Sequence, residues 1–158
     1  MSLQFHAEVD RSLRAAGWRP GRHVPDLVRQ WRVQLESGSR FILHPAAERV
    51  LLEFGGLHIG AAGPGVDRSP SELNLDPTVA AGEDDRFLDY FPELHGRAVF
   101  PLGEVDGGNG FLGIDTTGRT YLLMDEVCGR WPTFISAIEG LLRGIRDSFP
   151  QKPSTGAV

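Results

Sequence analysis

The stretch AVFPLGEVDGGNGFLGIDTTGRTYLLMDEV, residues 98–127, contains three short apolar segments and two glycine-containing turns. The segments are residues 98–105, 111–118 and 120–127, and the turns are DGGNG and TTGR. Short apolar segments joined by tight turns are typical of β-hairpins, because glycine and asparagine adopt the backbone angles that such turns require. The stretch therefore predicts three strands of an antiparallel meander.

Three helices are predicted on the N-terminal side of this meander. The first carries apolar residues at helical spacing and ends at Gly17, since glycine commonly terminates helices. The second begins at Pro25 and ends near Ser37, and the third extends from Pro45 to Gly55. Proline is favoured in the first helical turn because an N–H group at that position has no partner within the helix.

Shorter elements surround the meander. Residues 57–62 and 73–75 are short extended candidates, and residues 83–95 indicate a short acidic helix interrupted at Pro92. A last helix is expected from about Thr133, where apolar residues again recur at helical spacing. Helices followed by consecutive strands favour an α+β fold with N-terminal helices, a mainly antiparallel sheet and a C-terminal helix.

Length and composition indicate one globular domain. The chain has 158 residues, of which 41% are hydrophobic, so it can bury a core without disulfide or metal cross-links. We expect a single domain over residues 1–150 and a disordered tail over residues 151–158, which are too polar and too few to fold alone. The single cysteine, the lack of a secretory signal and the lack of a long apolar run favour a cytoplasmic protein without membrane association.

The acidic side chains are concentrated in the middle of the chain. Residues 60–129 hold 13 Asp and Glu but only 4 Arg and Lys, whereas both flanking segments have a small basic excess. An acidic region repels the phosphates of nucleic acids and attracts basic protein surfaces. The sequence therefore predicts a protein partner with a basic surface and no direct binding of nucleic acid.

The segment GGLHIGAAGPG, residues 55–65, has the glycine content of a phosphate-binding loop. Such a loop lies between a strand and the N-terminus of the following helix, where backbone N–H groups and the helix dipole bind the anion. Here a predicted helix precedes the glycines, and no Lys-Ser or Lys-Thr pair follows them. We therefore interpret the segment as a helix terminator and turn in which the backbone packs closely against its neighbours.

The sequence predicts no metal, no cofactor and no catalytic residue. No two of the five histidines have the three- or four-residue spacing of ligands on one helical face. DGGNG at 106–110 resembles the first half of a calcium loop but lacks the later glutamate, so a hairpin turn is favoured. Cys128 follows two acidic residues, whose charges disfavour the thiolate, and we interpret it as a small apolar residue that is at least partly buried.

Acidic and aromatic residues are the candidates for contact with a partner. Paired carboxylates fall in predicted turns and on an exposed helix face, where general acid–base catalysis is not expected. The candidate contact residues are Asp84, Asp85, Asp89, Tyr90, Glu104, Asp106, Asp125 and Glu126. For each acid the alternative is that it only solvates an exposed face. Trp31 is expected in the core, whereas Trp18 fits either the core or a contact surface.

The order of several motifs resembles that of a known family. These motifs are AGWRPGR (16–22), FGGL (54–57), GPG (63–65), LDP (75–77), PLGE (101–104), GIDTTGRTYLL (113–123) and FISAIEGLLRG (134–144). Their order and spacing over about residues 10–146 are similar to those of the third subfamily of the SUKH superfamily. That subfamily consists of bacterial immunity proteins related to the Smi1/Knr4 and Syd proteins. The matching residues are typical fold determinants, so the resemblance transfers no binding or catalytic residue.

The resemblance implies an α+β fold and a non-enzymatic role. That role is to bind and neutralise a toxin domain, often a nuclease or a deaminase, of a polymorphic toxin system. Nucleases need basic surfaces for their substrates, so an acidic inhibitor would associate with them quickly. Two alternatives stay open. A Smi1/Knr4-like scaffold or regulator would bind housekeeping partners, and a hydrolase would need a deep pocket that holds two carboxylates.

Overall fold

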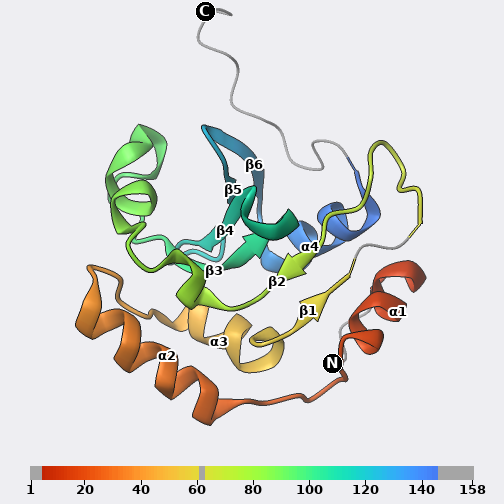
Figure 1. Ribbon diagram of the computed structural model, residues 1–158, viewed down its shortest axis with the longest axis horizontal. Coiled ribbons are helices and arrows are strands. Elements are labelled where there is room, and N and C mark those ends of the chain that lie inside the picture. Colours follow the sequence, from red (N-terminus) through yellow and green to blue (C-terminus); the bar gives the residue numbers. More distant parts are fainter. Residues whose placement is uncertain (1–4, 61–62, 146–158) are drawn as a thin grey trace, which may run out of the picture.

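The computed structural model describes residues 5–60 and 63–145. Helices and strands follow one another along these residues as shown in Figure 1. Their bounds are α1 Ala7–Ala15, α2 Pro25–Gly38, α3 Pro45–Phe54, β1 His58–Ile59, β2 Leu73–Asn74, η1 Pro77–Ala80, η2 Arg86–Tyr90, η3 Pro92–Leu94, β3 Phe100–Val105, η4 Asp106–Gly108, β4 Gly110–Ile114, β5 Thr120–Leu123, β6 Val127–Trp131 and α4 Phe134–Arg143. Each strand pairs antiparallel with the next one along the chain. The predicted α+β fold is confirmed; the predicted tail, residues 151–158, lies outside the described residues.

Local sequence signals set the helix ends. Pro25 and Pro45 are the first residues of α2 and α3, as predicted. At α4, Thr133 and Ser136 form a reciprocal capping box that satisfies backbone N–H groups of the first turn. Gly144 follows α4 with φ 66°, a left-handed conformation that glycine adopts at little cost. These helix ends therefore coincide with residues whose side chains or backbone angles suit a helix terminus.

The sheet has six strands, one more than the five extended segments predicted over residues 57–62, 73–75 and 98–127. The prediction of a single strand over residues 120–127 is wrong, because β5 ends at Leu123 and the chain turns back into β6. The N–H group of Met124 donates to the carbonyl of Glu126 at 3.0 Å and closes this turn. Residues 124–126 include neither glycine nor proline, so the sequence carries only a weak turn signal there.

The helix predicted over residues 83–95 is also corrected. The segment forms one π-helical turn, η2, and one 3₁₀ turn, η3, with Phe91 in extended conformation between them. Phe87 and Phe91 are buried, whereas Leu88 is only partly buried. The interruption at Pro92 is confirmed, because proline begins η3 and lacks the N–H group that would continue a regular helix.

Aromatic side chains join the N-terminal helices to α4. The Trp18 and Phe54 rings stack with centroids 6.1 Å apart, and Phe54 lies 5.1 Å from Phe134 of α4. Trp18 is only 3% exposed, and its indole N–H donates to the Glu53 carboxylate at 2.9 Å. Of its two interpretations, the core position is therefore correct. Trp31 is also buried, as predicted.

The glycine-rich segment turns the chain and continues into a loop that caps the last helix. Residues 61–62 lie outside the described residues. The N–H groups of residues 66–68 donate to the carbonyls of Arg143 and Gly144 at 2.9–3.0 Å, and so satisfy acceptors that have no partner within α4. A Cβ atom at Gly65 would lie 1.9 Å from the carbonyl oxygen of Arg68. The turn and the close backbone packing predicted for this segment are confirmed.

A buried carboxylate organises the hairpin between β4 and β5. Asp115 is fully buried, and its Oδ1 atom accepts from the N–H groups of Thr117 at 2.8 Å and Arg119 at 3.1 Å. Its Oδ2 atom accepts from the Tyr121 hydroxyl at 2.8 Å and lies 3.6 Å from the Arg97 guanidinium. A buried charge is tolerated only with such compensating donors. The turn TTGR is thus held by the side chain that directly precedes it.

Gly65→Ala is expected to lower the free energy of unfolding by about 2–4 kcal/mol, because the new Cβ adds a backbone clash to left-handed strain. Gly63→Ala is a matched control, since Gly63 has φ 76° against 77° for Gly65, but among the described residues no atom beyond its chain neighbours lies within 4 Å of an added Cβ. In this control the free energy of unfolding should fall by only about 1–2 kcal/mol, because backbone strain is the sole cost. Urea denaturation measures both losses, and equal losses would contradict a role for the close approach.

Tyr121→Phe is expected to flatten the pH dependence of stability in alkaline solution. Burial and the hydrogen bond to Asp115 raise the pKa of Tyr121 to about 12, above its ordinary value of 10.0. The folded protein therefore holds the phenolic proton more tightly, and this contribution is present below pH 10 and is lost as the pH rises towards 12. Urea unfolding from pH 8 to 11.5 compares the two proteins. Parallel stability curves would show that the Tyr121 hydroxyl has no such role.

Candidate functional site

The eight predicted contact residues fall into three groups. Asp84, Asp85, Asp89 and Tyr90 lie in or beside η2, Asp125 and Glu126 form the turn between β5 and β6, and Glu104 and Asp106 lie at the junction of β3 and η4. The first two groups are far apart in sequence, but the structure brings Asp85 and Tyr90 of the first group and Asp125 of the second together at one cleft. The third group does not line that cleft.

Arg86 joins η2 to the turn between β5 and β6. Its Nη1 atom donates to the carbonyl of Met124 at 2.7 Å, and its Nε atom lies 3.7 Å from the Glu83 carboxylate. Next to this contact lies a cleft of about 220 Å³, which we call the η2 cleft. Its lining residues are Glu83, Asp85, Arg86, Tyr90 and Asp125. Three of the candidate residues therefore share one concave surface.

Arg40 neutralises part of the acidity beside the cleft. Its guanidinium pairs with Asp85 at 2.8 Å and also with Asp89, while its backbone N–H donates to Asp84 at 3.2 Å. The hydrogen bond to Asp89 is the main cause that raises the pKa of Arg40 above its ordinary value. Sequence reasoning missed Arg40, because it precedes the acids by at least 44 residues and no local pattern links them.

Tyr90 presents an aromatic ring at the edge of the cleft. The residue is 64% exposed, as a candidate contact residue should be. Its ring meets the ring of buried Phe91 edge to face, with centroids 4.8 Å apart. An exposed aromatic side chain that packs on a buried neighbour loses little conformational entropy when a partner covers it.

Glu104 and Asp106 occupy a different environment. Glu104 is partly buried on β3, opposite Asn74 and Phe111 in the sheet register. Asp106 has φ 49°, and its carboxylate accepts from the backbone N–H of Glu72 at 2.9 Å. The side chain of Asp106 thus has a local structural role that the sequence did not reveal.

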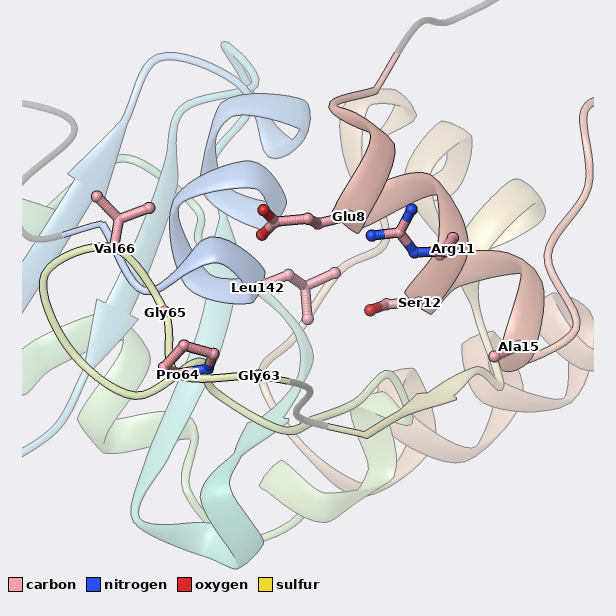
Figure 2. Close-up of a pocket in the computed structure, with 9 residues that line it drawn as sticks. All are labelled: Glu8, Arg11, Ser12, Ala15, Gly63, Pro64, Gly65, Val66 and Leu142. Atoms are coloured by element: carbon pink, nitrogen blue, oxygen red, sulfur yellow. The ribbon is translucent and has the colours of Figure 1, made fainter.

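A second groove lies between α1 and the loop that caps α4. It has a volume of about 460 Å³ and is lined by Glu8, Arg11, Ser12, Ala15, Gly63, Pro64, Gly65, Val66 and Leu142. Figure 2 shows Glu8, Arg11 and Ser12 on the α1 side, facing Leu142 of α4. Glu8 is the one carboxylate among these lining residues, so the groove does not have the paired carboxylates that a hydrolase would need.

The described part of the chain contains neither a metal-ion cluster nor a membrane-spanning helix. Across residues 5–60 and 63–145, no group of three or more His, Cys, Asp or Glu side chains is arranged to hold a metal ion. None of the helices in these ranges is long and apolar enough to cross a bilayer. The prediction for Cys128 is not tested, because its side chain lies outside what the structure describes.

Comparison with protein families shows to which family this chain belongs. The family described as SUKH-3 immunity protein matches residues 5–144. The chain belongs to this family. The match extends from Phe5, two residues before α1, to Gly144, which directly follows α4, and so covers nearly the whole described fold. Comparisons with curated proteins and with solved structures gave no significant match.

The motifs that resembled the SUKH family serve mainly structural roles in this SUKH-3 protein. GPG ends at Gly65, which approaches the backbone of Arg68. GIDTTGRTYLL contains Asp115 and Tyr121 of the buried hairpin network. FISAIEGLLRG is α4 with its C-terminal Gly144. The η2 cleft lies outside these three motifs, so the family relationship does not assign its residues a role.

Arg40→Gln is expected to speed hydrogen exchange of the backbone amides of residues 84–90, because the side chain that links three carboxylates is lost. The melting temperature should change little, since exposed ion pairs contribute little to global stability. Arg32→Gln is a matched control that removes the exposed pair of Arg32 with Glu48, 3.0 Å apart. Unchanged exchange at residues 84–90 would contradict the linking role of Arg40.

Proposed function

We propose that this SUKH-3 protein binds and neutralises a cognate toxin domain of a bacterial polymorphic toxin system in the cytoplasm. Membership of an immunity protein family supports the toxin as a protein partner. Neutralisation would occur by occlusion of the toxin, without catalysis by the immunity protein. The observation that points to the toxin-binding surface is that η2 and the β5–β6 turn lie together at one acidic cleft.

The charge of the η2 cleft supports a basic partner surface. Three carboxylates and one guanidinium line the cleft, and that guanidinium is already bound to the Met124 carbonyl. A nuclease or a deaminase that acts on nucleic acid carries basic side chains to hold phosphates. An acidic inhibitor covers such a surface and is steered towards it, whereas it repels the nucleic acid itself.

The candidate residues differ in how freely they can contact a partner. Asp125 and Glu126 are exposed, and neither forms an ion pair with another described residue. Asp85 and Asp89 share Arg40, so each has part of its charge compensated. We therefore assign the largest electrostatic contribution to the turn between β5 and β6, and an anchoring contribution to Tyr90.

Rescue of toxicity tests this function. The toxin domain encoded beside the gene for this chain is expressed with and without the SUKH-3 protein, and the purified pair is studied by calorimetry. Immunity predicts restored growth and a tight complex of defined stoichiometry. Growth that stays inhibited, together with no binding, would contradict this pairing and favour the Smi1/Knr4-like scaffold alternative.

Asp125→Lys is expected to slow association with the toxin domain by roughly ten-fold at low ionic strength, because electrostatic steering towards a basic surface is weakened. The difference from the wild-type protein should shrink as salt is added. Glu8→Lys makes the same charge change at an exposed residue of α1 and should leave the rate unchanged. In Figure 1, α1 (red) and the green segment that contains η2 lie on opposite sides of the molecule. Stopped-flow kinetics measures these rates. Equal slowing by both variants would exclude a specific role for the η2 cleft.

A further inference from the structure

The η2 cleft has the size of a site for one side chain. Its volume of about 220 Å³ corresponds to roughly seven water molecules at ~30 Å³ each. The cleft opens between two chain segments that Arg86 holds together through the carbonyl of Met124. One long side chain of a partner would fill this space, whereas a whole helix or strand would not.

The charges around the cleft favour a cation. Asp125 forms no ion pair with another described residue, and Asp85 uses one oxygen atom to bind Arg40. A carboxylate accepts up to about four hydrogen bonds, so Asp85 keeps capacity for a second donor. The one cation that lines the cleft, Arg86, donates to the carbonyl of Met124 and lies near Glu83. The cleft thus presents more negative charge than its own guanidinium compensates.

The aromatic ring of Tyr90 lines the cleft and favours arginine over lysine. A cation is attracted to the face of an aromatic ring, and the planar guanidinium of arginine also stacks on it. Arginine further binds carboxylates through two parallel hydrogen bonds, which the ammonium group of lysine does not match. The ring of Tyr90 packs against Phe91 and is largely exposed. Ring and carboxylates together match the chemistry of arginine.

We infer that the η2 cleft receives an arginine side chain of the toxin domain, which stacks on Tyr90 and pairs with Asp85 and Asp125. The inference rests on the proposed function for the identity of the partner. It adds the class of side chain recognised and the three residues that recognise it. Asp84 and Asp89 then serve to hold Arg40, and through it Asp85, at the edge of the cleft.

The recognition of arginine is tested without the toxin. N-acetyl-arginine amide is titrated into the isotope-labelled protein, and backbone amide shifts are followed by NMR. We expect saturable shifts centred on Tyr90 and Asp125, with binding roughly ten-fold weaker for the neutral analogue N-acetyl-citrulline amide. Shifts that are absent, or that are equal for both compounds, would overturn the inference.

Substitutions separate the roles of ring and charge. Tyr90→Phe should retain binding of the arginine amide, whereas Tyr90→Leu and Asp125→Asn should each weaken it several-fold. Glu8→Gln is the matched control for loss of an exposed carboxylate and should bind like the wild-type protein. Equal binding by Tyr90→Leu and Tyr90→Phe would refute a role of the aromatic ring.

The same variants distinguish failure of this inference from failure of the proposed function. In the complex with the toxin domain, Tyr90→Leu and Asp125→Asn should each weaken affinity roughly ten-fold or more, as at an interface hot spot. Rescue by the wild-type protein with no loss in these variants would overturn the arginine site and leave immunity intact. No rescue by the wild-type protein would overturn the proposed function, and with it the toxin as the source of the arginine.

Discussion

The buried carboxylate of Asp115 sets the strand register on which the candidate surface depends. It binds the backbone of the turn between β4 and β5, so that Thr120 pairs with Ile114 and Leu123 with Phe111. The end of β5 is thereby placed, and with it the Met124 carbonyl that Arg86 binds. A hydrogen-bond network at one end of the hairpin thus determines the geometry of a cleft at the other end.

The η2 segment is irregular, yet two of its side chains hold it in place. Phe87 is fully buried, with its ring centroid 5.7 Å from that of Phe111 on β4. Arg86 is the adjacent residue, and it binds the turn between β5 and β6. An apolar anchor and a directional hydrogen bond together compensate for the missing regular helix. The exposed residues of η2, including Tyr90, are therefore presented from a defined position.

Ion pairs within the protein determine which of its carboxylates have uncompensated charge for a partner. The excess of carboxylates in residues 60–129 is partly balanced by Arg40, which comes from the N-terminal part of the chain. This pairing reduces repulsion among the η2 acids in the free protein. The acids of the β5–β6 turn have no such ion pair with a described residue, which is why the proposed contact with a basic toxin surface is assigned mainly to them.

The sequence alone determined features that depend on local backbone chemistry. Proline and threonine marked helix starts at Pro25, Pro45 and Thr133, and glycine-containing turns marked the hairpins between β3 and β4 and between β4 and β5. The prediction was wrong at the turn of residues 124–126, where these residues are missing, and over residues 83–95, where a π-helical turn and a 3₁₀ turn replace the expected helix. The order of the motifs along the chain also indicated the SUKH-3 family, and the family match over residues 5–144 confirms it.

Only the tertiary structure decided which acidic residues share a surface. Arg86 reaches a carbonyl 38 residues away, and Arg40 reaches carboxylates at least 44 residues away. Such contacts depend on the path of the whole chain, and local residue preferences do not encode them. The sequence thus determined the kinds of element, the excess of acid and the family, whereas folding determined that Asp85, Tyr90 and Asp125 line one cleft, because that cleft forms between distant segments.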